Sequence, residues 1–230
     1  MKDTIFNAVL ALLFGFIGAG IWAYSPLAEK RTKAYLVSNP QILPEMAEAY
    51  QRQEALERLA DVSDEVMGGF PGAVMGNPDG SKVLVKFSDY NCGYCRTSHA
   101  DVKKLVASDP DLKVILREFP IFEGSEAAAR MGLAAAKQGL YAEFHAQMFA
   151  KAPATQASVV AAAEAAGMDM VRAEADANSP EVDLELLETR ALAEQLGFGG
   201  TPSWVTKNNA FEGAIGFEAL KEAVDTAKES

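Results

Sequence analysis

Cysteine and histidine are almost absent from this chain of 230 residues. Its two cysteines, Cys92 and Cys95, lie three positions apart, and its two histidines are His99 and His145. A structural zinc site usually needs a second close pair of ligands, and His145 is far along the chain from the other three, so zinc is disfavoured. A disulfide between such near neighbours closes too short a loop to stabilise the fold appreciably. We therefore expect Cys92 and Cys95 to form one redox centre, without a metal.

The chain also lacks repeats, low-complexity tracts and any stripe of basic residues. Its net charge is -11, with 32 acidic against 21 basic residues, and the acids are spread along the whole sequence. We therefore expect no nucleic-acid partner, because such partners are bound through clustered Lys and Arg. The length suits one large domain with an appendage, and 49% hydrophobic residues are typical of a folded protein.

Charge is missing from residues 4–24 near the N-terminus. This stretch is longer than the roughly 7 to 15 apolar residues of a signal peptide and close to the ~20 that cross a bilayer. No clear A-x-A cleavage site follows. We expect residues 1–28 to send the chain to a membrane, as a signal peptide or, slightly favoured, as an uncleaved anchor. The three basic residues of 30–33 would keep this side in the cytoplasm if the domain behind them were short.

Residues 29–69 are interpreted as a helical stalk. Apolar residues recur at helical spacing among many charges in residues 44–66, which predicts an exposed amphipathic helix. Residues 34–43 predict a shorter helix, broken by Asn39-Pro40 and by Pro44. The stalk is expected to pair with copies of itself, and the alternative is a helix packed on its own domain. Gly68 to Gly72 then mark a hinge.

The remaining chain alternates strand and helix patterns around a long helical block. A strand, the helix that follows the cysteines and a second strand predict a βαβ unit. Alanine-rich residues with Gly or Pro breaks predict helices from 125 to 196. The fold class is therefore α/β, with a small mixed sheet interrupted by helices. The expected strands are residues 82–87, 111–117, 203–207 and 210–213, and a last helix covers 217–228.

The two cysteines are expected to have different roles. Cys92 lies at the junction between a strand and a helix, and Cys95 lies one turn into that helix. A helix N-terminus favours an anion, here the Cys92 thiolate, so Cys92 is expected to attack at neutral pH. Cys95 is more shielded and is expected to be the resolving thiol. His99, one turn further on, is expected to have no catalytic role.

Several motifs, in order, resemble a known family. FSDYNCGYC, REFPIF, AAAKQGLYAEFH, GFGGTPSWV and EGAIGFEAL are similar to the DsbA-like thiol-disulfide oxidoreductases, the branch of the thioredoxin fold with a helical insertion. The segment AYLVSNPQILPEMAEAYQRQE resembles the N-terminal region of the ScsC-like (suppressor of copper sensitivity) proteins, where it builds an oligomerising stalk. The resemblance implies a thioredoxin domain over residues 70–230, with its helical insertion at about 122–197, and no cofactor.

The resemblance also assigns the active-site residues. Cys92 matches the nucleophile and Cys95 the resolving cysteine, while Thr201-Pro202 matches the loop whose cis proline faces them. A cis X-Pro bond there would leave the Thr201 backbone free to pair with a substrate strand. Between the cysteines stand Gly93-Tyr94, without the histidine of the strongly oxidising prototype. Together with Thr201, this dipeptide is closer to DsbC-type isomerases.

One position departs from the family pattern. Lys86 stands six residues before Cys92, where related proteins often carry a buried acid that assists proton transfer. A buried Lys86 would favour a thiolate electrostatically but cannot accept a proton while it is charged. Glu118, on the neighbouring predicted strand, is the candidate partner of Lys86 or the substitute acid.

The sequence thus predicts a periplasmic thiol-disulfide oxidoreductase, because such pairs work in oxidising compartments. The favoured activity is that of an isomerase or reductase acting on cysteine-containing exported proteins. Residues 29–66 would form a homo-oligomer, a membrane redox partner would recycle the pair, and residues 4–24 are the candidate tether. The alternatives are a DsbA-type oxidase and a Cu(I)-binding or chaperone module, since paired thiolates suit Cu(I).

Overall fold

The structure, a computed structural model, describes residues 2–151 and 153–227. Its contacts divide the chain into two compact units, Met1–Gln51 and Arg52–Ser230. Helix α3, Leu43–Gly68, runs through this division. The predicted stalk of residues 29–69 therefore spans both units, and its C-terminal part belongs to the larger one.

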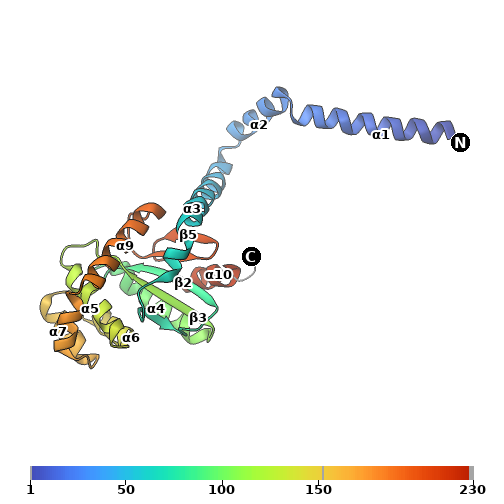
Figure 1. Cartoon of the computed structure of the whole chain (residues 1–230). Helices are drawn as coiled ribbons and strands as arrows, with labels where there is room; N and C mark the ends of the chain where they lie inside the picture. The colour runs from blue at the N-terminus through green and yellow to red at the C-terminus, as the bar shows by residue number, and fades with distance from the viewer. Residues whose placement is uncertain (1, 152, 228–230) are drawn as a thin grey trace. The chain divides into compact units, whose positions relative to one another are not determined.

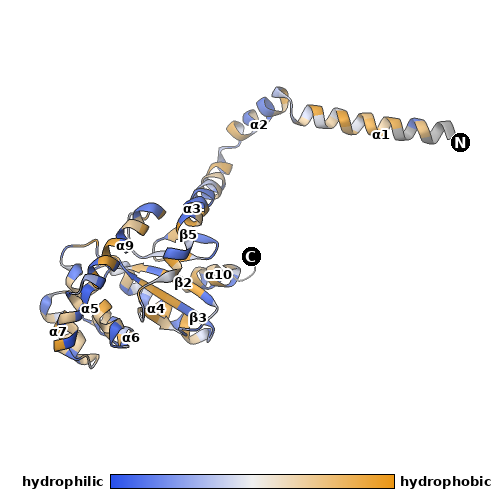
Figure 2. Cartoon of the chain, in the orientation of Figure 1, coloured by the Kyte–Doolittle hydropathy of each residue, from blue (hydrophilic) through white to orange (hydrophobic). Residues whose placement is uncertain are grey.

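The N-terminal unit consists of helices. It contains α1 (Lys2–Ala23), α2 (Pro26–Ser38), a 3-10 turn (Pro40–Ile42) and the start of α3. Helix α2 begins where Ser25 accepts a hydrogen bond from the backbone of Ala28, with a proline in the first helical position. Figure 2 shows α1 mostly in the hydrophobic colour and α2 mostly in the hydrophilic one.

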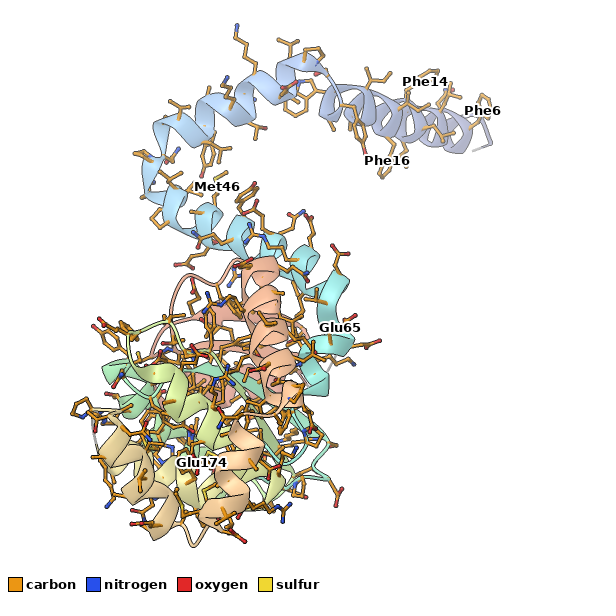
Figure 3. The ribbon with its side chains drawn as sticks, turned by 60° about the vertical axis from the view of Figure 1, so that its left-hand side comes forward. Phe6, Phe14, Phe16, Met46, Glu65 and Glu174 are labelled. Carbon is orange, nitrogen blue, oxygen red and sulfur yellow. The ribbon has the colours of Figure 1, made fainter. Side chains whose placement is uncertain are left out.

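Apolar side chains surround α1. Phe14 and Phe16 project from opposite sides of the helix (Figure 3) and are 67% and 78% exposed. Among the described residues, no single helix meets the length and hydropathy expected of a membrane span. The segment Leu10–Ala23 and helix α2 meet them only as a pair, which is bent by 58°.

The prediction for Pro44 is wrong. Helix α2 ends at Ser38, before Asn39-Pro40, as expected, but Pro44 lies in the first turn of α3 and breaks nothing. A proline is tolerated there because the first backbone N–H groups of a helix have no intrahelical acceptor.

The larger unit contains one five-stranded mixed sheet in the order β1-β3-β2-β4-β5. Strands β2 and β3 are parallel and are joined by α4 (Gly93–Ser108), while the other neighbours are antiparallel. This is the predicted βαβ unit with a returning hairpin. Strand β1 was not predicted, because three residues are too few to show an alternating pattern. The strands are β1 (Val74–Gly76), β2 (Lys82–Ser88), β3 (Leu112–Glu118), β4 (Ser203–Thr206) and β5 (Asn209–Glu212).

Helices cover both faces of the sheet. Leu84 and Trp204 lie in a buried cluster with residues of α4 and of α10 (Phe217–Ala227). Val85 and Phe87 alternate with them and lie in a second cluster with residues of α3 and α9 (Pro180–Leu196). Successive strand residues point to opposite faces, so Lys86 points to the same face as Leu84, the side of α4.

The C-terminal half of α3 packs on the sheet. Leu59, Val62 and Val66 are buried in the second cluster. Arg117 of β3 is itself buried, and it donates to the backbone carbonyl groups of Glu65 and Val66 near the end of α3. These carbonyls would otherwise lack partners at a helix end. The alternative interpretation, a helix packed on its own domain, thus holds for this half of the helix.

The helical block lies between β3 and β4, as the sequence predicts. Figure 1 shows α5, α6 and α7 gathered beside the sheet. Small alanines of α5 and α7 let these helices approach closely around Phe144 and Met148 of α6, in a cluster that also contains both cysteines. The five helices are α5 (Ser125–Lys137), α6 (Tyr141–Ala150), α7 (Gln156–Ala165), α8 (Met170–Ala177) and α9.

Candidate active site

Cys92 caps the N-terminus of α4. Its Sγ accepts a hydrogen bond from the backbone N–H of Cys95 at 3.4 Å. Both cysteines are free and buried, with exposed fractions of 3% for Cys92 and 0% for Cys95. An N–H aimed at sulfur and the positive end of the helix dipole both stabilise a thiolate. The assignment of Cys92 as nucleophile and Cys95 as resolving thiol stays a prediction that this geometry supports.

The predicted cis-proline loop lies against Cys92. The Thr201-Pro202 peptide bond is cis, and the Cys92 thiol donates to the carbonyl oxygen of Thr201 at 3.1 Å. Pro202 directly precedes β4, which pairs with β2 in the centre of the sheet. The loop therefore reaches Cys92, the expected nucleophile.

Asp89 fixes the loop that leads to Cys92. Its Oδ1 accepts from the backbone of Asn91 at 2.7 Å, and its Oδ2 accepts from Ile121 and Phe122 at 2.7 and 2.9 Å. Asp89 is 1% exposed and was not predicted as a site residue. Its signal in the sequence is an acid directly before the short turn to a helix, where such side chains bind backbone N–H groups.

Exposed apolar side chains lie near Cys92 and in the segment of Ile121 and Phe122, whose backbone Asp89 binds. Tyr94, between the cysteines, is 70% exposed, and Ile121 and Phe122 are 39% and 49% exposed. The neighbouring Gly93 is exposed as well. Exposed apolar groups beside a reactive thiol suit contact with a partner chain, so Gly93-Tyr94 remain candidate substrate-binding residues.

Lys86 lies next to the cysteine pair. It is wholly buried, and its Nζ donates to the carbonyl oxygen of Cys95 at 3.3 Å. The same Nζ lies 5.5 Å from the ring centroids of Phe149 and Trp204, which also stabilise a cation. Burial is the main effect and lowers the pKa of Lys86 to about 8.

Lys86 interacts electrostatically with both cysteines and with Glu118. Burial raises the pKa of the Cys95 thiol, and the Lys86 ammonium opposes that rise. The thiols of Cys95 and Cys92 and the Glu118 carboxyl favour the charged form of Lys86 in return. With a pKa of about 8, Lys86 is mostly protonated at pH 7 and provides a buried positive charge for a thiolate.

Glu118 is buried on the neighbouring strand but is not ion-paired with Lys86. Among the described residues its Oε1 accepts from the hydroxyl groups of Tyr90 and Tyr141, at 2.8 and 2.6 Å. Burial raises the pKa of Glu118 to about 8, although both hydrogen bonds oppose the rise. The carboxyl therefore acts on Lys86 through its charge when it is ionised, and not through a hydrogen bond.

His145 completes this buried group and was not predicted as a site residue. Its Nδ1 lies 2.9 Å from the Tyr90 hydroxyl oxygen, and its ring stacks on that of Tyr141. Tyr141 and His145 are four residues apart on one helix, a spacing that places both on the same face. In the part of the chain that is described, no three His, Cys, Asp or Glu side chains are placed to hold a metal ion.

Comparison with known families identifies the larger unit. Residues 83–225 match the family described as the DSBA-like thioredoxin domain. The chain belongs to this family. Residues 29–57 match a second family, the N-terminal domain of the copper resistance protein ScsC.

Solved structures agree with this assignment. A thioredoxin-like oxidoreductase from Silicibacter pomeroyi is 38% identical, with a TM-score of 0.69 over 73% of this chain and 98% of that one. A linker-deletion mutant of Proteus mirabilis ScsC is 26% identical, with a TM-score of 0.70 over 90% and 98%. The thiol-disulfide exchange protein alpha-DsbA2 from Wolbachia pipientis is 25% identical, with a TM-score of 0.70 over 77% and 97%.

The curated relatives are longer proteins. Na(+)/H(+) antiporters NhaA from Herminiimonas arsenicoxydans and Salinispora arenicola are 25% and 23% identical over 157 and 158 residues. The match covers 67% of this chain but only 25% and 24% of theirs. The chain thus spans about a quarter of the curated relatives it matches.

These findings confirm the predicted fold and enzyme class. The chain has a thioredoxin fold with a helical insertion, preceded by a helical N-terminal region. It is a protein thiol-disulfide oxidoreductase of the DsbA and ScsC type.

Proposed function

We propose that the Cys92–Cys95 pair reduces and reshuffles wrong disulfides in exported proteins, as an oligomeric isomerase or reductase in the bacterial periplasm. The observation that carries this proposal is the joining of two matched regions: an ScsC N-terminal domain over residues 29–57 and a DSBA-like domain over 83–225. An isomerase benefits from several active sites held around one client. A periplasmic location fits a free cysteine pair that exchanges disulfides.

Exposed apolar side chains support self-association of the N-terminal region. Helix α2 has no buried residue, although Leu27, Tyr35 and Val37 are apolar and 70%, 59% and 73% exposed. Leu43 and Met46, at the start of α3, are 66% and 44% exposed. Several large apolar side chains exposed on neighbouring helices suit an interaction site. A second copy of the same helices would cover it.

The hydrogen bonds of Cys92 suggest how a client binds. The Cys92 thiol donates to the carbonyl oxygen of Thr201. A thiolate has no proton to donate, so activation of Cys92 releases this carbonyl as an acceptor. An extended client segment can then pair with the Thr201 backbone beside the attacking sulfur, in the manner of an added strand.

The exchange itself is balanced within the pair and the client. The Cys92 thiolate attacks one sulfur of a client disulfide, the client S–S bond breaks, and the other client sulfur leaves as a thiolate that takes up a proton. In a reshuffling reaction, a second client thiolate attacks this mixed disulfide and releases Cys92. In a reduction, Cys95 loses its proton, forms the bond to Cys92 and releases the client thiolate, so the pair gives two electrons to the client.

We expect the oligomer and the isomerase activity to depend on the same residues. A protein of residues 29–230 should have the mass of an oligomer by light scattering, and it should reactivate scrambled ribonuclease. The shorter protein Arg52–Ser230, a compact unit by itself, should be a monomer by the same measurement. The shorter protein should lose about 90% or more of the reactivation rate, because joined sites gain effective concentration.

Reduction of a small disulfide provides the control for this comparison. It uses one active site, so both proteins should perform it at similar rates. A monomeric 29–230 protein that rapidly oxidises a reduced peptide and does not reactivate scrambled ribonuclease would contradict the proposal and favour the DsbA-type oxidase.

A further inference from the structure

A single hydroxyl group connects Glu118 to His145. The Tyr90 oxygen lies 2.8 Å from Oε1 of Glu118 and 2.9 Å from Nδ1 of His145. All three residues are buried, with at most 2% of their surface exposed. Since a tyrosine hydroxyl has one proton, Tyr90 can donate to only one of these neighbours, and the other must donate to Tyr90.

Only two proton arrangements satisfy both hydrogen bonds. In the first, Glu118 is ionised, Tyr90 donates to it, and His145 donates from Nδ1. In the second, Glu118 is protonated and donates to Tyr90, which donates to Nδ1 of His145, so the proton of the imidazole is on Nε2. The arrangements differ by one proton on Glu118 and by the tautomer of His145. Two short hops, from Nδ1 of His145 to Tyr90 and from Tyr90 to Glu118, together with the uptake of one proton at Nε2 of His145, convert the first into the second and leave no charge on Tyr90.

The surroundings of Glu118 direct its proton toward Tyr90. Its Oε2 is buried and has no hydrogen-bond partner among the described residues. A proton on Oε2 would be a buried, unpaired donor, which costs free energy. A proton on Oε1 faces the Tyr90 oxygen, while Tyr141 donates to the same Oε1 in both arrangements.

A glycine keeps the space that this contact needs. Gly132 lies inside α5, where alanine would be the better helix former. A Cβ at Gly132 would lie 2.7 Å from Oε1 of Glu118 and 3.0 Å from the Tyr90 hydroxyl oxygen. A side chain at position 132 would therefore collide with the carboxyl and hydroxyl groups, and glycine lets the backbone of α5 lie against them.

The outer end of the chain of hydrogen bonds is His145, and the ring of His99 lies beside it without a hydrogen bond. Nε2 of His145 and Nδ1 of His99 are buried and have no hydrogen-bond partner in the described part of the chain. The two rings lie 5.1 Å apart, and His99, on α4, is partly exposed to solvent. Burial lowers the pKa of His99 to about 4 and that of His145 well below its ordinary value. Both imidazoles are thus neutral at pH 7 and can accept a proton on one nitrogen while releasing one from the other.

The inner end reaches the cysteine pair through Lys86. The Lys86 ammonium donates to the Cys95 carbonyl oxygen and interacts with both thiols and with Glu118. A disulfide carries no charge, whereas a reduced pair with one thiolate carries a negative charge beside Lys86. The buried positive charge therefore loses a partner whenever the pair is oxidised, and an isolated buried charge is costly.

We propose that Glu118 releases its proton through Tyr90 and His145 when the cysteine pair becomes a disulfide, and takes one up by the same path when the pair is reduced. Lys86 then faces one negative charge in either state. On reduction, two electrons enter the pair, the S–S bond breaks, one sulfur remains a thiolate and the other gains a proton. The proton for Glu118 enters from solvent at the His99 side. The ionisable groups that act on Glu118 and His145 are Lys86, Asp89, Tyr90, His99 and Tyr141.

An infrared difference spectrum of the full chain, reduced minus oxidised at pH 7, tests whether the protonation of Glu118 changes with the redox state of the pair. We expect the carbonyl band of a protonated carboxyl group to appear on reduction and to be missing in Glu118→Gln. A wild-type spectrum without a redox-dependent carboxyl band would overturn the proposal. Dithiothreitol serves as reductant, so the result does not depend on whether the pair acts as an isomerase or an oxidase.

Two tyrosine variants test the path. Tyr90→Phe and Tyr141→Phe each remove one hydroxyl that donates to Oε1 of Glu118, but only Tyr90 also contacts His145 through its hydroxyl. After rapid reduction, the carboxyl band should appear about tenfold more slowly or worse in Tyr90→Phe. Tyr141→Phe should keep the wild-type rate and its slowing in heavy water. Equal slowing in both variants would mean a merely structural role and would overturn the path.

Discussion

Cys92→Ala is expected to abolish all dithiol-dependent activity, whereas Cys95→Ala is expected to stop the reaction halfway and accumulate disulfide-linked client adducts. Cys92 is the sulfur that caps α4 and accepts the Cys95 N–H. Without it, no thiolate is placed to attack. Without Cys95, the mixed disulfide still forms but cannot be resolved from within the pair.

Mass spectrometry of the alkylated proteins would measure this difference. The single variant Cys95→Ala should show adducts through Cys92, and the double variant Cys92→Ala/Cys95→Ala should show none. Adducts on Cys95 in the Cys92→Ala variant, at the level seen for Cys92 in Cys95→Ala, would contradict the assignment of roles. Burial argues against that result, because it raises the pKa of the Cys95 thiol.

Lys86→Met is expected to make the pair less oxidising. The Lys86 ammonium is buried beside the pair and opposes the rise in the pKa of Cys95. Its removal leaves the thiolate of the pair without a buried positive charge beside it and so destabilises the reduced, thiolate-containing form. A thiol pKa shift of one unit is about 1.4 kcal/mol, which corresponds to about 30 mV in a two-electron couple. We therefore expect a potential more negative by about 30 mV or more, measured by glutathione equilibration.

The pH dependence of this difference distinguishes a charge effect from a packing effect. The pKa of Lys86 is lowered to about 8, so the side chain is charged below that pH and neutral above it. The gap between wild type and Lys86→Met should thus shrink as the pH rises through about 8. Lys104→Met is the matched control, since this lysine is exposed on α4, and its potential should stay at the wild-type value. A Lys86→Met gap that is constant from pH 6 to pH 10 would contradict the account.

The sequence predicted the cysteine end of the site because its determinants are local. Cys92, Gly93, Tyr94 and Cys95 follow a β-branched strand and begin a helix, and such patterns depend on neighbouring residues. The strand adjacency of Lys86 and Glu118 also followed from pattern alone. The structure brings both side chains into the buried site, although as separate groups and not as an ion pair.

The contacts that Tyr90 and His145 make with Glu118 could not be found in this way. Tyr90, Glu118 and His145 come from three elements that are distant in the sequence, and only the helical insertion brings α6 against the sheet. A histidine on an apolar helix face is usually a core residue, and burial with defined partners distinguishes this one. The packing of α3 on the sheet was predicted only as the alternative, for a related reason. Its partner, Arg117, has the sequence pattern of an ordinary charge at a strand end but is 1% exposed.

The reduction potential of the Cys92–Cys95 pair, measured by glutathione equilibration on residues 29–230 with light scattering of the same sample, tests the proposed function most directly. The account predicts an oligomer whose potential lies clearly below about -120 mV, the value of a strong oxidant. A monomer with a potential near about -120 mV would instead show an oxidase and contradict the isomerase or reductase proposal.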